Sequence, residues 1–167
     1  MILGSTPAKE AHPETDLLVT QMLSQQRYAE AYQLLINQQS NQTSVLFNTA
    51  LCLHWSGNYQ AALSRLDSIR LAAQLNNTNK LNADNDYKGI KSKQNQTDDY
   101  LHGVSETYVK SFPDLLHDAI VRLKTDCWLR LGNYTKVIAI ATPIAHKGYK
   151  DITDALKLAQ TANDKRI

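Results

Sequence analysis

The stretch HWSGNYQAAL, residues 54–63, places a Gly-Asn-Tyr turn between two apolar runs. Glycine readily adopts the left-handed conformation that ends a helix, and asparagine is a preferred first cap of the next one. Apolar residues recur near every 3.6 positions on both sides, at Val45, Leu46, Ala50 and Leu53, then at Tyr59, Ala62, Leu63 and Leu66. The stretch therefore predicts two helices joined by a short turn and packed antiparallel.

The same turn recurs in RLGNYTKVI, residues 130–138, and a related one lies in QQRYAEAYQLL, residues 25–35. All three share one skeleton: a turn, Tyr, two residues, a small apolar residue, a larger one and then a further apolar position. Tyr28 and Tyr59 are 31 residues apart, close to the ~34 of a helix-turn-helix repeat. The longer interval to Tyr134 fits one more repeat plus an insertion of about 40 residues. Because one such hairpin cannot bury its own apolar face, the pattern predicts an all-α fold of stacked hairpins.

These residues resemble the tetratricopeptide repeat. The middle repeat carries the family pattern at Ala50, Leu53, Gly57, Asn58, Tyr59, Ala62 and Leu66. The last repeat keeps Trp128, Gly132, Asn133 and Tyr134 but has Thr125 and Val137 at its two small-residue positions; the first keeps Tyr28 and Ala31 but has Gln26 and Arg27 in place of Gly-Asn. The resemblance implies a right-handed α-solenoid of about three hairpins with a C-terminal capping helix.

The domain organisation follows from changes in composition along the chain. Residues 1–13 are polar with two prolines and are expected to form a flexible arm, followed by a single tetratricopeptide-like domain over residues 14–164. A polar insertion is expected at about residues 76–112: its first part, through residue 97, should be mobile, and its second part should hold a short helix. Pro113 suits the first turn of a helix, whereas Pro143 should bend or shorten one.

Composition excludes several classes of protein. With 167 residues, 43% apolar and 20% charged, the chain is typical of a soluble globular domain. The net charge of +2 gives no strong electrostatic footprint for nucleic acid, and no apolar run approaches the ~18 residues of a membrane span. The first residues do not form a signal peptide, so we expect a cytoplasmic protein. Cys52 and Cys127 are expected to be buried small side chains without a disulfide.

No pattern typical of catalysis or metal binding is visible. The five histidines, His12, His54, His102, His117 and His146, are scattered, and none forms a recurring metal-ligand spacing with Cys, Asp or Glu on one helix face. The sequence has no glycine-rich phosphate loop, nucleophile elbow or paired carboxylates. We therefore expect no cofactor, no metal ion and no enzymatic activity.

The tetratricopeptide resemblance implies that the first helix of each hairpin lines a concave groove. The positions that match are Thr20, Ser24, Phe47, Leu51, His54, Trp55, Arg122, Asp126 and Arg130. An aromatic and apolar patch beside two arginines is a composition that suits peptide binding. The alternative is that Phe47 and Leu51 pack on a neighbouring helix or on the insertion, and that Trp55 only covers its turn. Asp16 and Thr20 stand where some family members grip a C-terminal carboxylate with Lys and Asn, so that clamp is not expected here.

The leading hypothesis is a non-catalytic protein–protein interaction scaffold, or adaptor. It would bind a peptide or helix of a partner protein in the concave groove, and the insertion could fold over the groove as a lid. The alternative is a structural subunit that docks permanently into a larger complex or a homo-oligomer, with a larger and more apolar interface. The sequence leaves the oligomeric state and the identity of the partner open.

Overall fold

The computed structural model describes residues 12–71 and 84–165, and within them every regular element is a helix. Contacts within the chain divide it into two compact units. Unit 1 consists of Met1–Ile69 and His102–Phe112, and unit 2 of Arg70–Leu101 and Pro113–Ile167. The segment expected as one insertion is thus shared between the two units. The all-α prediction is confirmed for the described residues, whereas most of the predicted N-terminal arm lies outside them.

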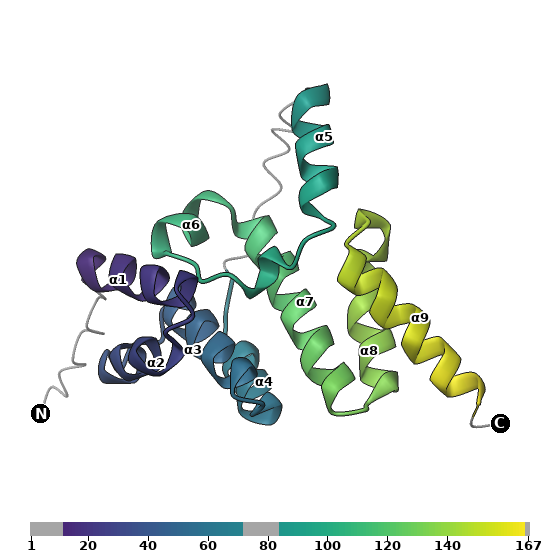
Figure 1. Ribbon diagram of the computed structural model, residues 1–167, viewed down its shortest axis with the longest axis horizontal. Helices are drawn as coiled ribbons and strands as arrows, with labels where there is room; N and C mark the ends of the chain where they lie inside the picture. Colours follow the sequence, from purple (N-terminus) through teal and green to yellow (C-terminus); the bar gives the residue numbers. More distant parts are fainter. Residues whose placement is uncertain (1–11, 72–83, 166–167) are drawn as a thin grey trace, which may run out of the picture. The chain divides into compact units, whose positions relative to one another are not determined.

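Unit 1 contains two helical hairpins and one short returning helix (Figure 1). Its elements are α1 (Pro13–Ser24), α2 (Tyr28–Asn37), α3 (Thr43–Trp55), α4 (Tyr59–Asp67) and α6 (Glu106–Ser111). Helix α2 packs against both α1 and α3, and α3 packs against α4 and α6. The small residues Ala31, Ala50 and Ala62 are fully buried, as expected where helix backbones approach one another closely.

Unit 2 contains the third hairpin and the final helix (Figure 1). Its elements are α5 (Asn85–Gln94), η1 (Asp99–Leu101), α7 (Pro113–Arg130), α8 (Tyr134–Ala141), η2 (Thr142–Lys147) and α9 (Lys150–Asp164). Pro113 begins α7 as predicted, and α8 ends at Ala141 just before Pro143. Helices α7, α8 and α9 pack against one another around a core that includes Leu123, Val137, Ile152 and Ala155.

Part of the expected mobile insertion is helical. Helix α5 begins after Asp84, whose side chain accepts a hydrogen bond from the Tyr87 N–H at 2.7 Å and caps the helix. None of its residues is buried, so the apolar periodicity on which the sequence reasoning relied is missing here. Residues 76–83 of the predicted insertion lie outside the described residues.

The three hairpin turns share one backbone conformation. The left-handed position is taken by Gln26 at φ 59°, Gly57 at φ 82° and Gly132 at φ 71°. In each turn the next residue donates its N–H to a carbonyl five residues earlier: Arg27 to Met22, Asn58 to Leu53 and Asn133 to Trp128. This is the Schellman arrangement. The equivalence of the three turns, inferred from sequence, therefore extends to their hydrogen bonds, including the turn that has no glycine.

Gln26→Gly should stabilise unit 1 by about 0.5–1 kcal/mol, because Gln26 holds a left-handed conformation that costs a non-glycine residue energy. The neighbouring Gln25→Gly is the matched control: Gln25 has a negative φ, so its replacement should only add chain entropy to the unfolded state and destabilise slightly. Urea denaturation of both variants measures the difference. Equal or reversed effects would show that Gln26 is not strained.

Both cysteines are buried, as predicted. Cys52 lies in α3 of unit 1 and Cys127 in α7 of unit 2, and both are free thiols. Burial raises the pKa of each thiol to about 12. At neutral pH both side chains therefore stay protonated, which suits packing positions rather than reactive thiols.

Candidate functional site

Four of the predicted groove residues of unit 1 lie along the lengths of α1 and α3. Phe47 and Leu51 are 0% and 2% exposed, so both belong to the core and neither can contact a partner. This corrects the groove prediction, and the packing alternative describes these two residues. The Thr20 and Ser24 hydroxyls donate to carbonyls of their own helix, those of Leu17 and Gln21.

His54 and Trp55 lie at the C-terminal end of α3, among aromatic rings. The Trp55 side chain is 63% exposed and stacks on Tyr28, with ring centroids 4.6 Å apart. The half-buried His54 meets Tyr59 edge to face at 5.4 Å. These contacts fit the prediction that Trp55 covers a turn, while its outer surface stays accessible.

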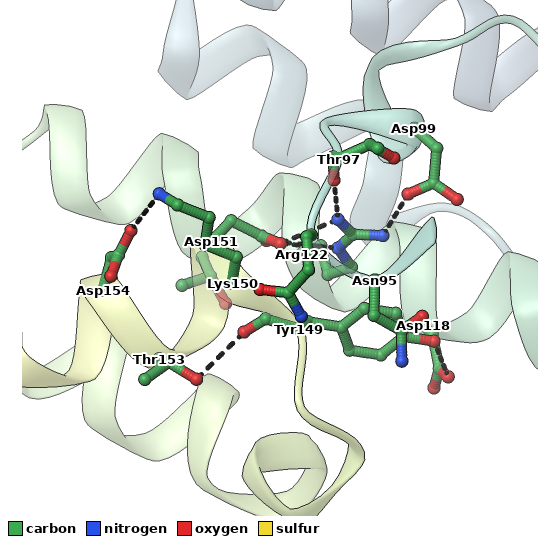
Figure 2. A network of polar contacts seen from close by, with 12 residues as sticks. Asn95, Thr97, Asp99, Asp118, Arg122, Tyr149, Lys150, Asp151, Thr153 and Asp154 are labelled. Carbon is green, nitrogen blue, oxygen red and sulfur yellow. Dashed lines mark hydrogen bonds and ion pairs between the residues drawn. The ribbon is translucent and has the colours of Figure 1, made fainter. Parts of the chain in front are cut away.

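The other three predicted groove residues lie on α7 of unit 2. Arg130 is exposed and its Nε lies 3.6 Å from the half-buried Asp126 carboxylate, one helical turn away. Arg122 is only 2% exposed. Its guanidinium pairs with Asp99 and Asp151 and donates to the Thr97 carbonyl at 2.8 Å (Figure 2). Arg122 is therefore a buried structural residue, which corrects its assignment to a groove.

Two tyrosines and a third carboxylate extend this network, and Figure 2 labels Tyr149 and Asp118 among them. The Arg122 guanidinium lies 4.6 Å from the ring of Tyr100 and 4.3 Å from that of Tyr149. The Tyr149 hydroxyl donates to buried Asp118, which also pairs with Lys147 at 2.8 Å. Every charge here has a partner, so we interpret the network as the clamp that holds η1 and the start of α9 against α7.

A different set of contacts in unit 1 holds a short irregular segment of the chain against α1 and α3. Residues 103–105, between η1 and α6, have no helical or strand assignment. We call residues 103–106 the strap. The Asn48 side chain donates to the Val104 carbonyl at 2.8 Å and accepts from the Val104 N–H at 2.9 Å. Asn48 is buried, with 1% of its surface exposed. Its amide donates to and accepts from one residue of the strap, as the backbone of a neighbouring β-strand does.

The end of the strap is held by charged and helix-terminal groups. The Asp16 carboxylate, on α1, accepts from the Glu106 N–H at 2.8 Å. In return, the Glu106 carboxylate accepts from the Ser44 N–H at 3.4 Å, in the first turn of α3. Gln42, which precedes α3, makes no side-chain cap. Glu106 therefore supplies an anion to a helix N-terminus that otherwise lacks a side-chain acceptor.

The strap lies very close to α1 at Gly103. A Cβ at this position would lie 2.6 Å from Leu23 Cδ1 and 3.2 Å from Leu23 Cβ. Its backbone φ is not in the left-handed region, so it is this close approach that requires glycine. We call the strap-contacting surface, made by Asp16, Leu23, Ser44 and Asn48, the α1–α3 face.

Burial shapes the electrostatics of the α1–α3 face. It raises the pKa of Asp16; the hydrogen bond from the Glu106 N–H opposes this shift, and the nearby Glu106 carboxylate adds to it. A carboxylate in this position favours a main-chain N–H as its partner. The buried Ser44 Oγ makes no hydrogen bond within the described residues, so the strap does not satisfy every polar group of the face.

Sequence reasoning missed most of this face. Asn48 is the signal that could have revealed it, because an amide stands in the middle of the apolar run SVLFNTALCL, residues 44–53. A polar side chain at the centre of a buried helix needs partners, and the question of which groups satisfy it leads to the strap. Asp16 was noticed only as a mismatch to a carboxylate clamp, yet it binds a backbone N–H.

Comparison with known proteins gives no relative from which a function could be transferred: no family model, curated protein or solved structure matches the chain. Within residues 12–71 and 84–165, no cluster of three or more His, Cys, Asp or Glu side chains is placed to hold a metal ion. Over the same residues, no helix has the length and apolar character that crossing a membrane requires.

Proposed function

We propose that the chain is a non-catalytic interaction scaffold of the cytoplasm that binds an extended peptide segment of a partner protein on the α1–α3 face. One observation carries this proposal: the face holds a segment of its own chain that is neither helix nor strand, through the main-chain groups of that segment. Asn48 pairs with both backbone groups of Val104, and Asp16 accepts the N–H of Glu106. A surface that pairs with backbone groups gains affinity for an extended peptide, and the side-chain positions beside it set the specificity.

The tetratricopeptide-like solenoid is part of the same proposal. Its support is the shared Schellman geometry of the turns at Gln26, Gly57 and Gly132, together with the packing of α2 between α1 and α3. In such a scaffold the first helices of successive hairpins, here α1 and α3, supply the binding surface. The position of the α1–α3 face agrees with this arrangement, although the residues that form it differ from those predicted.

A structural subunit is the second candidate, and exposed apolar side chains favour it. Leu17 is 65% exposed on α1 of unit 1, and Leu158 is 51% exposed on α9 of unit 2. A permanent interface would cover such residues. Sedimentation of the purified chain at several concentrations separates the two candidates. A stable monomer supports the scaffold, and a dimer or larger assembly that persists on dilution supports the structural subunit.

A random peptide library displayed on phage and panned against the full-length chain tests the proposal. We expect enriched peptides that bind the wild type and an Asn41→Ala control equally, because Asn41 is exposed. Asn48→Leu should bind the same peptides at least tenfold more weakly, since it loses the bidentate amide. The assay is run at 10 °C, with circular dichroism to verify folding. No enrichment, or peptides indifferent to Asn48→Leu, would contradict the proposal.

A further inference from the structure

We infer that the strap is a displaceable internal ligand, and that the partner is a peptide with an extended Gly–apolar–x–acidic segment that competes with it. This inference rests on the function proposed above and adds to it the chemistry of the partner and the control of the site. The strap itself reads Gly-Val-Ser-Glu over residues 103–106, and each of its contacts on the α1–α3 face sets one requirement.

The first requirement is a residue without a side chain. At Gly103 a Cβ would lie 2.6 Å from Leu23 Cδ1, and Leu23 is itself buried, which limits its freedom to move aside. The next residue must offer both its N–H and its carbonyl to Asn48, which excludes proline there. Val104 is 7% exposed, so this residue should also be apolar.

The last requirement is a carboxylate at the residue two positions after the apolar one. At that position a backbone N–H meets Asp16, and the side chain reaches the first turn of α3 at Ser44. Asp16 is an acceptor and the helix terminus offers donors, so a peptide with an N–H and an acidic side chain at one residue satisfies both. Lysine or arginine at this position would place its charge against the α3 N-terminus.

Three features of the strap favour its displacement by a competing peptide. Its hydrogen bonds to α1 and α3 are made through side chains, and the one from the Ser44 N–H is long, at 3.4 Å. The buried Ser44 Oγ is left without a hydrogen bond within the described residues. Helix α6, which begins at the last strap residue, Glu106, is short and buries one side chain, that of Val109. A ligand whose carboxylate comes closer to Ser44 could satisfy both of its polar groups.

Competition has a measurable consequence. A tethered strap acts at a high effective concentration, so the apparent affinity for a free peptide is the intrinsic affinity multiplied by the fraction of time that the face is open. Removing the strap from the face without altering the face should therefore strengthen peptide binding. Gly103→Val does this, because its side chain is directed against Leu23. Gly89→Val is the matched control, since a Cβ at Gly89 meets no atom within 4 Å.

The experiment measures fluorescence anisotropy of a labelled peptide with the sequence of residues 102–112, HGVSETYVKSF. We expect full-length Gly103→Val to bind it at least tenfold more tightly than the wild type or Gly89→Val. Adding Asn48→Leu to Gly103→Val should abolish binding, and so should a peptide with the glutamate changed to lysine. Equal affinities for the wild type and Gly103→Val, or no binding to either, would overturn the inference.

If Gly103→Val does not fold, hydrogen exchange of the wild type decides the question. Strap amides that exchange about 100-fold faster than those of central α3 support displacement, and equal protection overturns it. The failures are distinguishable. Suppose that phage panning yields peptides whose binding depends on Asn48, while the peptide of residues 102–112 binds the wild type and Gly103→Val equally. In that case only the inference that the strap is displaceable fails. If panning yields no peptides, the proposed function itself fails.

Discussion

Replacing Arg122 with alanine is expected to lower the free energy of unfolding of unit 2 by about 3–5 kcal/mol. The guanidinium is buried between Tyr100 and Tyr149 and neutralises the carboxylates of Asp99 and Asp151. In the alanine variant, both carboxylates would remain in a partly buried site and would lose the positive charge that neutralises them. The Thr97 carbonyl would lose its donor as well.

The chain supplies its own control and its own probes. Arg130→Ala on the same helix should change the free energy of unfolding by less than about 1 kcal/mol, because Arg130 is exposed and its pair with Asp126 is long. Each unit contains one tryptophan, Trp55 in unit 1 and Trp128 in unit 2. A Trp55→Phe background therefore reports the urea denaturation of unit 2 alone. Similar effects of the two alanine substitutions would refute the structural role of Arg122.

Asn48→Leu is expected to cost unit 1 about 2–4 kcal/mol while the strap stays bound. Leucine has a similar shape but leaves the N–H and carbonyl of Val104 without the partners that Asn48 provides. If the strap can leave the face, this loss is capped by the free energy of strap binding, because detachment returns both groups to water. The cap is a direct consequence of a displaceable strap.

Thr49→Val is the matched control for Asn48→Leu. Thr49 is also buried in α3, but its hydroxyl donates to the Val45 carbonyl of its own helix at 2.7 Å, so its replacement should cost less than about 1.5 kcal/mol. Trp55 fluorescence in a Trp128→Phe background measures the unfolding of unit 1. A large loss with strap amides still protected from exchange would show that the strap is an integral part of the core.

Local patterns in the sequence predicted the helices and turns well. The period of the apolar residues located the three hairpins, and Gly57 and Gly132 located two of the turns. Gln26 adopts the same left-handed backbone without glycine, so the absence of glycine does not exclude such a turn. Helix α5 was not predicted because it buries no apolar face. The signal in the sequence is Asp84, whose side chain caps the N-terminus of the helix.

The candidate site was harder to predict because it depends on contacts distant in sequence. Asn48 meets Val104 across 56 positions, and Asp16 meets Glu106 across 90. Arg122 illustrates the opposite error. An arginine on a helix is expected to be exposed to solvent, but Arg122 is buried because Asp99 of η1 and Asp151 of α9 neutralise it. Periodicity can place a residue on a helix, but it cannot identify which distant segment covers that helix.

The most direct test follows the Asn48 side-chain amide by NMR, in isotope-labelled full-length Gly103→Val titrated with the unlabelled peptide of residues 102–112. We expect the two Asn48 amide protons to shift saturably and to show nuclear Overhauser contacts to the peptide valine that corresponds to Val104. Unshifted Asn48 amide protons at saturating peptide, with the α3 resonances still those of a folded helix, would contradict a peptide-binding role for the α1–α3 face.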